Sequence, residues 1–147
     1  KEHAEFTVEK LGIADKVMFL GNSNEIDRIL CFTDIFLLPS EKESFGLSAL
    51  EAMINKVAVI SSNTGGIPEV NIHGKTGFLS DVGDVDDMVA NTLRLLKDEK
   101  LLKKFKKQAF EVACTFDLQE VTAVGFVHHI RTKTPRKGEV LARDFGL

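Results

Sequence analysis

Two short apolar runs constrain the fold of this chain more than any other feature of its sequence. Residues 35–38 (Ile-Phe-Leu-Leu) and 57–60 (Val-Ala-Val-Ile) are apolar throughout. This pattern is typical of strands covered on both faces, because a strand with one wet face alternates apolar and polar residues. Segments with helical periodicity separate these runs, and residues 17–20 and 77–79 predict two further strands. The order predicts an α/β fold with a Rossmann-like, doubly wound parallel sheet.

The loops that follow the predicted strands hold the candidates for a binding site. Right-handed crossovers in a doubly wound sheet bring the strand-to-helix loops to one edge, where ligands bind in open α/β sheets. In this chain those loops contain residues 21–22, 40–47 and 61–66. We therefore expect a site where these three loops meet.

The longest of these loops, residues 40–47, leads into a helix that carries most of the candidate residues. Apolar residues recur there at the helical spacing and predict one buried face: Leu47, Leu50, Met53 and Ile54. The first backbone N–H groups of a helix have no partner within it and attract phosphate or developing negative charge. Here those groups belong to Ser44, Phe45, Gly46 and Leu47. Gly46 has no Cβ, so a ligand could approach the backbone closely there.

Glu51 is the unusual residue of this helix, because it lies at the edge of the predicted buried face. A carboxylate in that position costs folding free energy unless it is hydrogen-bonded. One interpretation is a partly exposed helix glutamate with no special role. The other is that Glu51 accepts hydrogen bonds from a pair of ligand hydroxyls, as an acidic residue does on the ribose in dinucleotide sites. A sugar nucleotide has both the hydroxyls and the phosphates that this segment would bind.

The spacing of Glu43 and Glu51 resembles a known motif. Two glutamates separated by seven residues, with Ser-Phe-Gly-Leu at 44–47 between them, are similar to the E-x7-E motif of retaining glycosyltransferases with the GT-B fold, family 4. Other segments match that family in order and spacing: residues 38–40, 51–53, 65–70 and 74–79. Within the family, residues 71–85 are most similar to members that transfer N-acetylglucosamine. The resemblance extends over residues 11–115.

This resemblance implies the C-terminal, donor-binding half of a GT-B enzyme. Such an enzyme moves a hexose, here N-acetylglucosamine from UDP, to a hydroxyl of a small-molecule or glycan acceptor with retention of configuration. The resemblance assigns the catalytic position to Glu43, which would hold a hydroxyl of the donor sugar, and the ribose to Glu51. The other donor-binding residues would be Ser44, Phe45, Gly46 and Leu47, and the nucleobase would meet Leu20, Gly21 and Asn22. No metal or other cofactor is expected, because such enzymes neutralise the leaving diphosphate with basic residues and helix amides.

The resemblance also bears on the extent of the domain. Residues 1–131 would form part of the donor-binding domain, and residues 132–147 a tail that is extended or disordered. The acceptor-binding N-terminal domain, and the Arg and Lys that bind the donor diphosphate, would lie outside this chain, which is therefore expected to be inactive alone. At residues 55–58, Asn-Lys-Val-Ala stands where the family commonly has Gly-x-Pro. We expect Asn55 to end the preceding helix in a left-handed conformation.

Composition limits the partners of this chain. A net charge of −3 does not favour binding to nucleic acid or to an anionic membrane. No apolar run is long enough to span a bilayer. Cys31 and Cys114, far apart and outside any C-x-x-C motif, are typical of reduced thiols in a cytoplasmic protein. The alternative to a transferase is a non-enzymatic Rossmann-like regulatory or nucleotide-binding module. A receiver domain of that kind needs an aspartate after a strand, whereas Asp34 comes before one.

Overall fold

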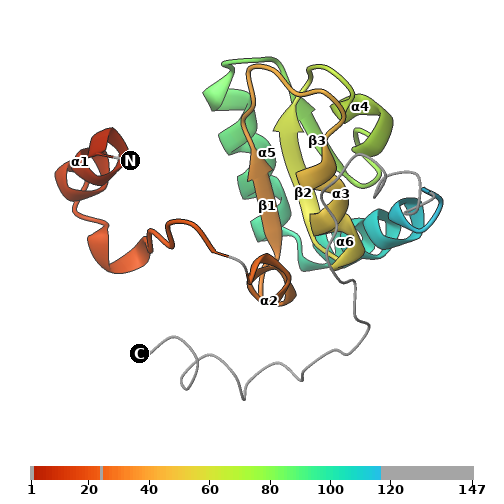
Figure 1. Cartoon of the computed structure of the whole chain (residues 1–147), viewed down its shortest axis with the longest axis horizontal. Helices are drawn as coiled ribbons and strands as arrows, with labels where there is room; N and C mark the ends of the chain where they lie inside the picture. Colours follow the sequence, from red (N-terminus) through yellow and green to blue (C-terminus); the bar gives the residue numbers. More distant parts are fainter. Residues whose placement is uncertain (1, 24, 117–147) are drawn as a thin grey trace.

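A parallel sheet of three strands in the order β1-β2-β3 organises the computed structural model of this chain, which describes residues 2–23 and 25–116 (Figure 1). The strands are β1 (Ile35–Leu38), β2 (Ala58–Ser62) and β3 (Gly77–Ser80). β2 lies in the middle, with Ile35 opposite Ala58 on one side and Val59 opposite Gly77 on the other. The strands predicted at 35–38, 57–60 and 77–79 are confirmed, with ends that differ by at most two residues.

Helices separate the strands along the chain. They are α1 (Glu2–Lys10), the 3-10 turn η1 (Ala14–Lys16), α2 (Ile26–Cys31), α3 (Leu47–Ile54), α4 (Ile67–Val70), α5 (Val85–Lys97) and α6 (Glu99–Ala113). Helices α5 and α6 each begin at an aspartate cap. The side chain of Asp84 accepts a hydrogen bond from the N–H of Asp87, and the side chain of Asp98 accepts one from the N–H of Leu101, both at 2.9 Å. Of the described helices, none is both long enough and apolar enough to cross a membrane.

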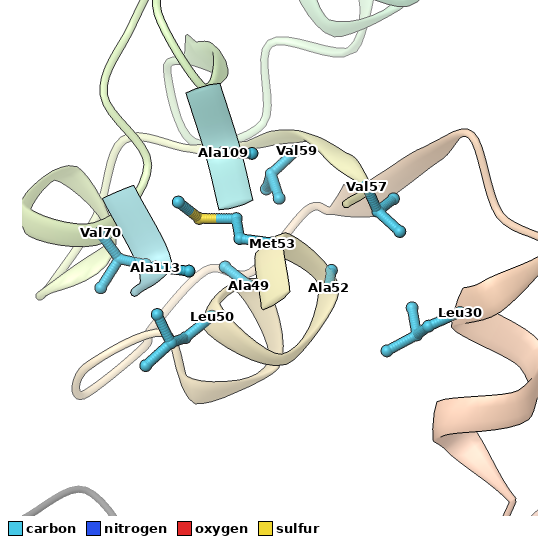
Figure 2. Close-up of a cluster of buried hydrophobic side chains, with 10 residues drawn as sticks. All are labelled: Leu30, Ala49, Leu50, Ala52, Met53, Val57, Val59, Val70, Ala109 and Ala113. Atoms are coloured by element: carbon cyan, nitrogen blue, oxygen red, sulfur yellow. The ribbon is translucent and has the colours of Figure 1, made fainter. Parts of the chain in front are cut away.

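The side chains of β2 divide the core into two clusters, one on each face of the sheet. Val59 contributes to the first cluster, together with Leu50 and Met53 of α3, and Figure 2 shows the Met53 side chain beside Val59 and Ala109. Ala58 and Ile60, which alternate with Val59, belong to the second cluster. Every residue of β2 is buried, as a strand covered on both faces must be. The doubly wound α/β architecture is therefore confirmed.

The helix α6 contributes to both clusters. Its Ala109 and Ala113 lie in the first cluster with α3, and its Phe105 lies in the second with Leu95 of α5. The predicted apolar face of α3 is buried at Leu50 and Met53 and half-buried at Leu47 and Ile54. Ala49 and Ala52 are also buried and complete the contact of α3 with the core.

Residues 17–20 do not form the predicted strand, and this prediction was wrong. An apolar strand needs a neighbouring backbone to pair with and cover for its side chains. In the described part of the chain, the other edge of β1 has no strand beside it, and the side chains of residues 17–20 are exposed. Figure 1 shows this segment leading from η1 toward α2 at a distance from the sheet.

Two predictions concern residues that the structure does not describe. The domain boundary after residue 131 and the tail at residues 132–147 both lie outside the described ranges, so they stay predictions.

Candidate functional site

The loops that follow β1 and β2 meet at one edge of the sheet. Parallel pairing puts the ends of both strands, Leu38 and Ser62, on the same side. The loop at residues 39–46 then turns toward α3 and the loop at residues 63–66 toward α4. The hydroxyl of Thr64 donates to the carbonyl of Glu41 at 3.4 Å, which links the two loops. The expectation that loops 40–47 and 61–66 come together is confirmed.

Two glycines allow a very close approach between these loops. A Cβ added to Gly65 would lie 1.6 Å from the carbonyl oxygen of Glu43, and one added to Gly66 would lie 2.8 Å from the Cα of Phe45. Real Cβ atoms essentially never come within 3.0 Å of such atoms. The Gly65-Gly66 pair therefore lets its loop pack directly against the backbone of residues 43–45. The sequence analysis did not assign this role to it.

The start of α3 presents open backbone N–H groups toward this edge. The cap residue is Gly46, whose φ of +89° lies in the left-handed region, and no side chain caps the helix. Within the described residues, the N–H groups of Phe45, Gly46 and Leu47 have no hydrogen-bond partner, as the sequence analysis predicted. Gly46 was expected to be a glycine so that a ligand could approach the backbone. The structure gives another reason, because the left-handed backbone at position 46 itself favours glycine.

Glu43 lies in the loop just before α3. Its side chain is half-buried and its Oε1 accepts the N–H of Ser44 at 3.1 Å. This bond occupies the Ser44 donor, so that three of the four N–H groups predicted to be open, those of Phe45, Gly46 and Leu47, are open.

Glu51 is half-buried on α3, and no described residue hydrogen-bonds its carboxylate. Burial raises the pKa of this carboxyl above its ordinary value of 4.5, and the negative charge of Asp27 on α2 raises the pKa further. The position at the edge of the buried face is the one predicted from the helical spacing. A carboxylate that has lost water without gaining a donor can accept hydrogen bonds from a bound molecule at little further desolvation cost.

The predicted nucleobase residues lie elsewhere in this structure. Leu20, Gly21 and Asn22 are exposed, they follow the segment that does not join the sheet, and none of them has a hydrogen bond to the loops at 39–46 or 63–66. Their role stays a prediction, whereas Glu43 and Glu51 lie in the loop before α3 and within α3 itself. Among the described residues no group of three or more His, Cys, Asp or Glu is placed to hold a metal ion.

A buried asparagine joins β2 to β3, and sequence reasoning missed it. The amide of Asn71 donates to the carbonyls of Val59 and Phe78 at 3.3 and 3.2 Å and to the hydroxyl of Ser61 at 2.8 Å. Its carbonyl accepts the hydroxyl of Thr76 at 2.8 Å. The network joins β2 to β3 just before the Gly-Gly loop. An amide directly after the helical turn at Ile67–Val70 was the available signal.

The end of α3 differs from the expectation. Asn55 has a φ of −81°, and the left-handed residue is Lys56, with a φ of +58°. The ammonium group of Lys56 lies 5.1 Å from the centre of the Phe110 ring on α6. This cation–π contact holds a residue that lacks glycine's freedom in a left-handed conformation.

Comparison with solved structures defines the class of this domain. The C-terminal domain of a glycosyl transferase group 1 family protein (LpcC) from Francisella tularensis superposes with a TM-score of 0.70 at 31% identity, covering 78% of this chain and 60% of that one. The Anabaena protein HepE, solved with UDP and glucose, superposes with a TM-score of 0.74 at 25% identity, covering 84% and 35% of the two chains. The fold is therefore that of the Rossmann-like C-terminal domain of a GT-B glycosyltransferase.

The family follows from the sequence comparisons. Residues 1–112 match the model of "Glycosyl transferases group 1", and the chain belongs to this family. The N-acetyl-alpha-D-glucosaminyl L-malate synthase of Bacillus anthracis is 46% identical over 104 residues, which are 71% of this chain and 27% of that protein. Sulfoquinovosyl transferase SQD2 of Arabidopsis thaliana is 35% identical over 120 residues, which are 78% and 24% of the two chains.

These matches confirm the resemblance read from residues 43–51, and they confirm the similarity to an N-acetylglucosamine-transferring member read from residues 71–85. The chain spans about a quarter of the length of these relatives. Membership of a glycosyltransferase family favours the transferase interpretation over a non-enzymatic module.

Proposed function

We propose that this chain is the nucleotide-sugar-binding part of a retaining glycosyltransferase that moves a hexose from a nucleotide diphosphate to an acceptor hydroxyl. The sugar is N-acetylglucosamine and the nucleotide is UDP. The match to the N-acetyl-alpha-D-glucosaminyl L-malate synthase supports the sugar, and the solved complex of HepE with UDP and glucose supports the nucleotide. The acceptor is a small molecule or glycan that meets the donor with the help of the rest of a longer protein.

The observation that carries this proposal is the state of Glu51. Its carboxylate is half-buried, has no donor among the described residues, and lies one turn beyond a helix start with three open N–H groups. A ribose offers two neighbouring hydroxyls to one carboxylate, and the adjoining diphosphate carries the negative charge that a helix start attracts. A sugar nucleotide supplies both in one molecule.

The remaining residues follow from this placement. The N–H groups of Phe45, Gly46 and Leu47 would receive the charge that grows on the diphosphate as the bond to the sugar breaks, which lowers the barrier to that step. Glu43 would hold a hydroxyl of the donor sugar and so fix the orientation of the ring. Ser44 would contribute through the bond that holds the Glu43 carboxylate in place.

Two further parts of the proposal concern the surroundings of the reaction. The leaving diphosphate would be neutralised by helix amides and basic residues, without a metal ion. We place the protein in the cytoplasm, because Cys31 and Cys114 are both free thiols, as suits a reducing compartment. The chain by itself would bind the donor and transfer no sugar.

Calorimetric titration of this chain with UDP, and separately with UDP-N-acetylglucosamine, tests the proposal in metal-free buffer of low ionic strength. A hydrogen bond to a charged group contributes about 1.5–3 kcal/mol. Glu51→Ala is therefore expected to weaken UDP binding at least about ten-fold. Glu111→Ala is the matched control, because this glutamate of α6 is exposed and pairs with Lys107 at 3.6 Å. Equal UDP affinity in wild type and Glu51→Ala would refute the ribose assignment.

A further inference from the structure

The helix α5 exposes an apolar stripe that nothing in the described part of the chain covers. Its residues and their exposed fractions are Val85 (68%), Val89 (50%), Leu93 (44%) and Leu96 (60%). At about 100° per residue they lie within an arc of roughly 80°. The side of α5 that packs on the sheet is centred about 110° from the stripe, because Leu95 is fully buried and Met88 lies against the second core cluster. The stripe is therefore a second apolar face beside the buried one, and it is exposed.

Charges of opposite sign lie along one flank of this stripe. Asp86 stands in the first turn of α5 and Lys97 in its last turn. They are eleven positions apart, close to three helical turns, so both lie on the same side of the stripe, about 20° from each other in projection. Neither takes part in an ion pair within the described residues.

This arrangement is complementary to itself. If two α5 helices pack antiparallel about a two-fold axis, Val85 of one meets Leu96 of the other and Val89 meets Leu93. The two-fold axis runs midway between the two helices and perpendicular to the plane that contains them. It therefore puts the charged flanks of both copies on the same side of the helix pair. Asp86 of one copy then lies beside Lys97 of the other, twice. Isologous interfaces of this kind are the commonest in homo-oligomers.

We propose that the apolar stripe of α5 is a dimer interface, occupied by the same stripe of a second copy of this chain. The charge pattern decides between a second copy and a lipid surface. An anionic membrane attracts basic flanks, whereas this flank carries an acid as well as a base and the whole chain has a net charge of −3. The interface lies on a different element from Glu43, Glu51 and the start of α3, so the proposal is independent of the proposed function.

Sedimentation equilibrium of the 147-residue chain measures the association. A single helix pair buries less surface than a standard interface, so the expected dissociation constant is on the order of 10 µM. Leu96→Gln is expected to raise this constant about ten-fold or more, because it puts a polar group against Val85 of the second copy at both ends of the stripe. Leu11→Gln is the matched control, since Leu11 is similarly exposed at 64% but lies outside α5, and it should leave the constant unchanged.

Charge reversal tests the antiparallel orientation. Lys97→Glu puts two acids side by side at each of the two symmetric pairs and is expected to weaken association about ten-fold, while Asp86→Lys combined with Lys97→Glu restores both pairs with reversed sign. Circular dichroism on each variant verifies that the helices are intact. A wild type that stays monomeric to about 100 µM would overturn the proposal. So would a dimer that Leu96→Gln and Lys97→Glu leave unchanged, or a folded double variant that does not recover.

Discussion

Replacing Gly65 with alanine tests the architecture of the candidate site with the smallest possible side chain. The added Cβ would lie 1.6 Å from the carbonyl oxygen of Glu43, whereas real contacts of this kind begin at 3.0 Å. The loops at residues 39–46 and 63–66 must therefore separate by at least the difference, 1.4 Å. The obstacle is backbone rather than the end of a flexible side chain, so the loops cannot relieve it by a rotamer change.

The cost of this substitution has two sources. Overpacking of a tight contact costs about 1–3 kcal/mol. Gly65 also has a φ of +55°, and a left-handed alanine adds roughly 1–2 kcal/mol. Gly74→Ala isolates the second source, because Gly74 has a φ of +74° and no atom within 4 Å of the added Cβ. We expect Gly65→Ala to lower the free energy of unfolding by about 2–5 kcal/mol and Gly74→Ala by roughly 1–2 kcal/mol.

Urea denaturation followed by circular dichroism measures both values, and calorimetry with UDP reports on the site. Separation of the loops moves the backbone of Glu43 and the open N–H groups beyond it, so Gly65→Ala should also bind UDP at least about ten-fold more weakly. Gly74→Ala should bind as the wild type does. Equal losses of stability in the two variants would refute the close contact, and unchanged UDP affinity in Gly65→Ala would refute its support of the site.

Two further substitutions test single groups. The raised pKa of Glu51 means that the folded chain holds the proton more tightly than the unfolded chain; this contribution to stability is present below pH 4.5 and is lost as the pH rises through the raised pKa. Glu51→Gln should therefore be more stable than the wild type at pH 7, with the difference in urea midpoints closing near pH 4; a difference independent of pH contradicts this cause. Lys56→Gly should be more stable than Lys56→Ala by about 1 kcal/mol in the same assay, because Lys56 is left-handed; the reverse order would exclude strain there.

The elements that follow from local pattern were predicted well. The apolar runs at residues 35–38 and 57–60 both became strands; the second lies in the middle of the sheet and is buried on both faces, whereas the first lies at the edge and leaves Leu37 exposed. Residues 17–20 have the same apolar character and form no strand, because pairing depends on a neighbour rather than on the segment itself. The position of the left-handed turn after α3 was misjudged by one residue, since both Asn55 and Lys56 stand where the family has its glycine motif.

The residues of the candidate site were proposed from the sequence, whereas the contacts that support the site were not. Helical spacing located Glu51 at the edge of a buried face, and the family motif added Glu43. The contact of Gly65 with Glu43, and the proximity of Asp27 to Glu51, join residues more than twenty positions apart. A single sequence contains no distance between such segments, so these supports became visible only in three dimensions.

One helix shared by two cores has a thermodynamic consequence. Because α6 supplies Phe105 to one cluster and Ala109 and Ala113 to the other, neither face of the sheet can lose its cover independently. Unfolding of the two faces is thereby coupled into one cooperative transition. A destabilising change in either cluster is then shared by the whole domain, and the loops that carry Glu43 and Gly65 keep their shape only as long as both clusters are intact.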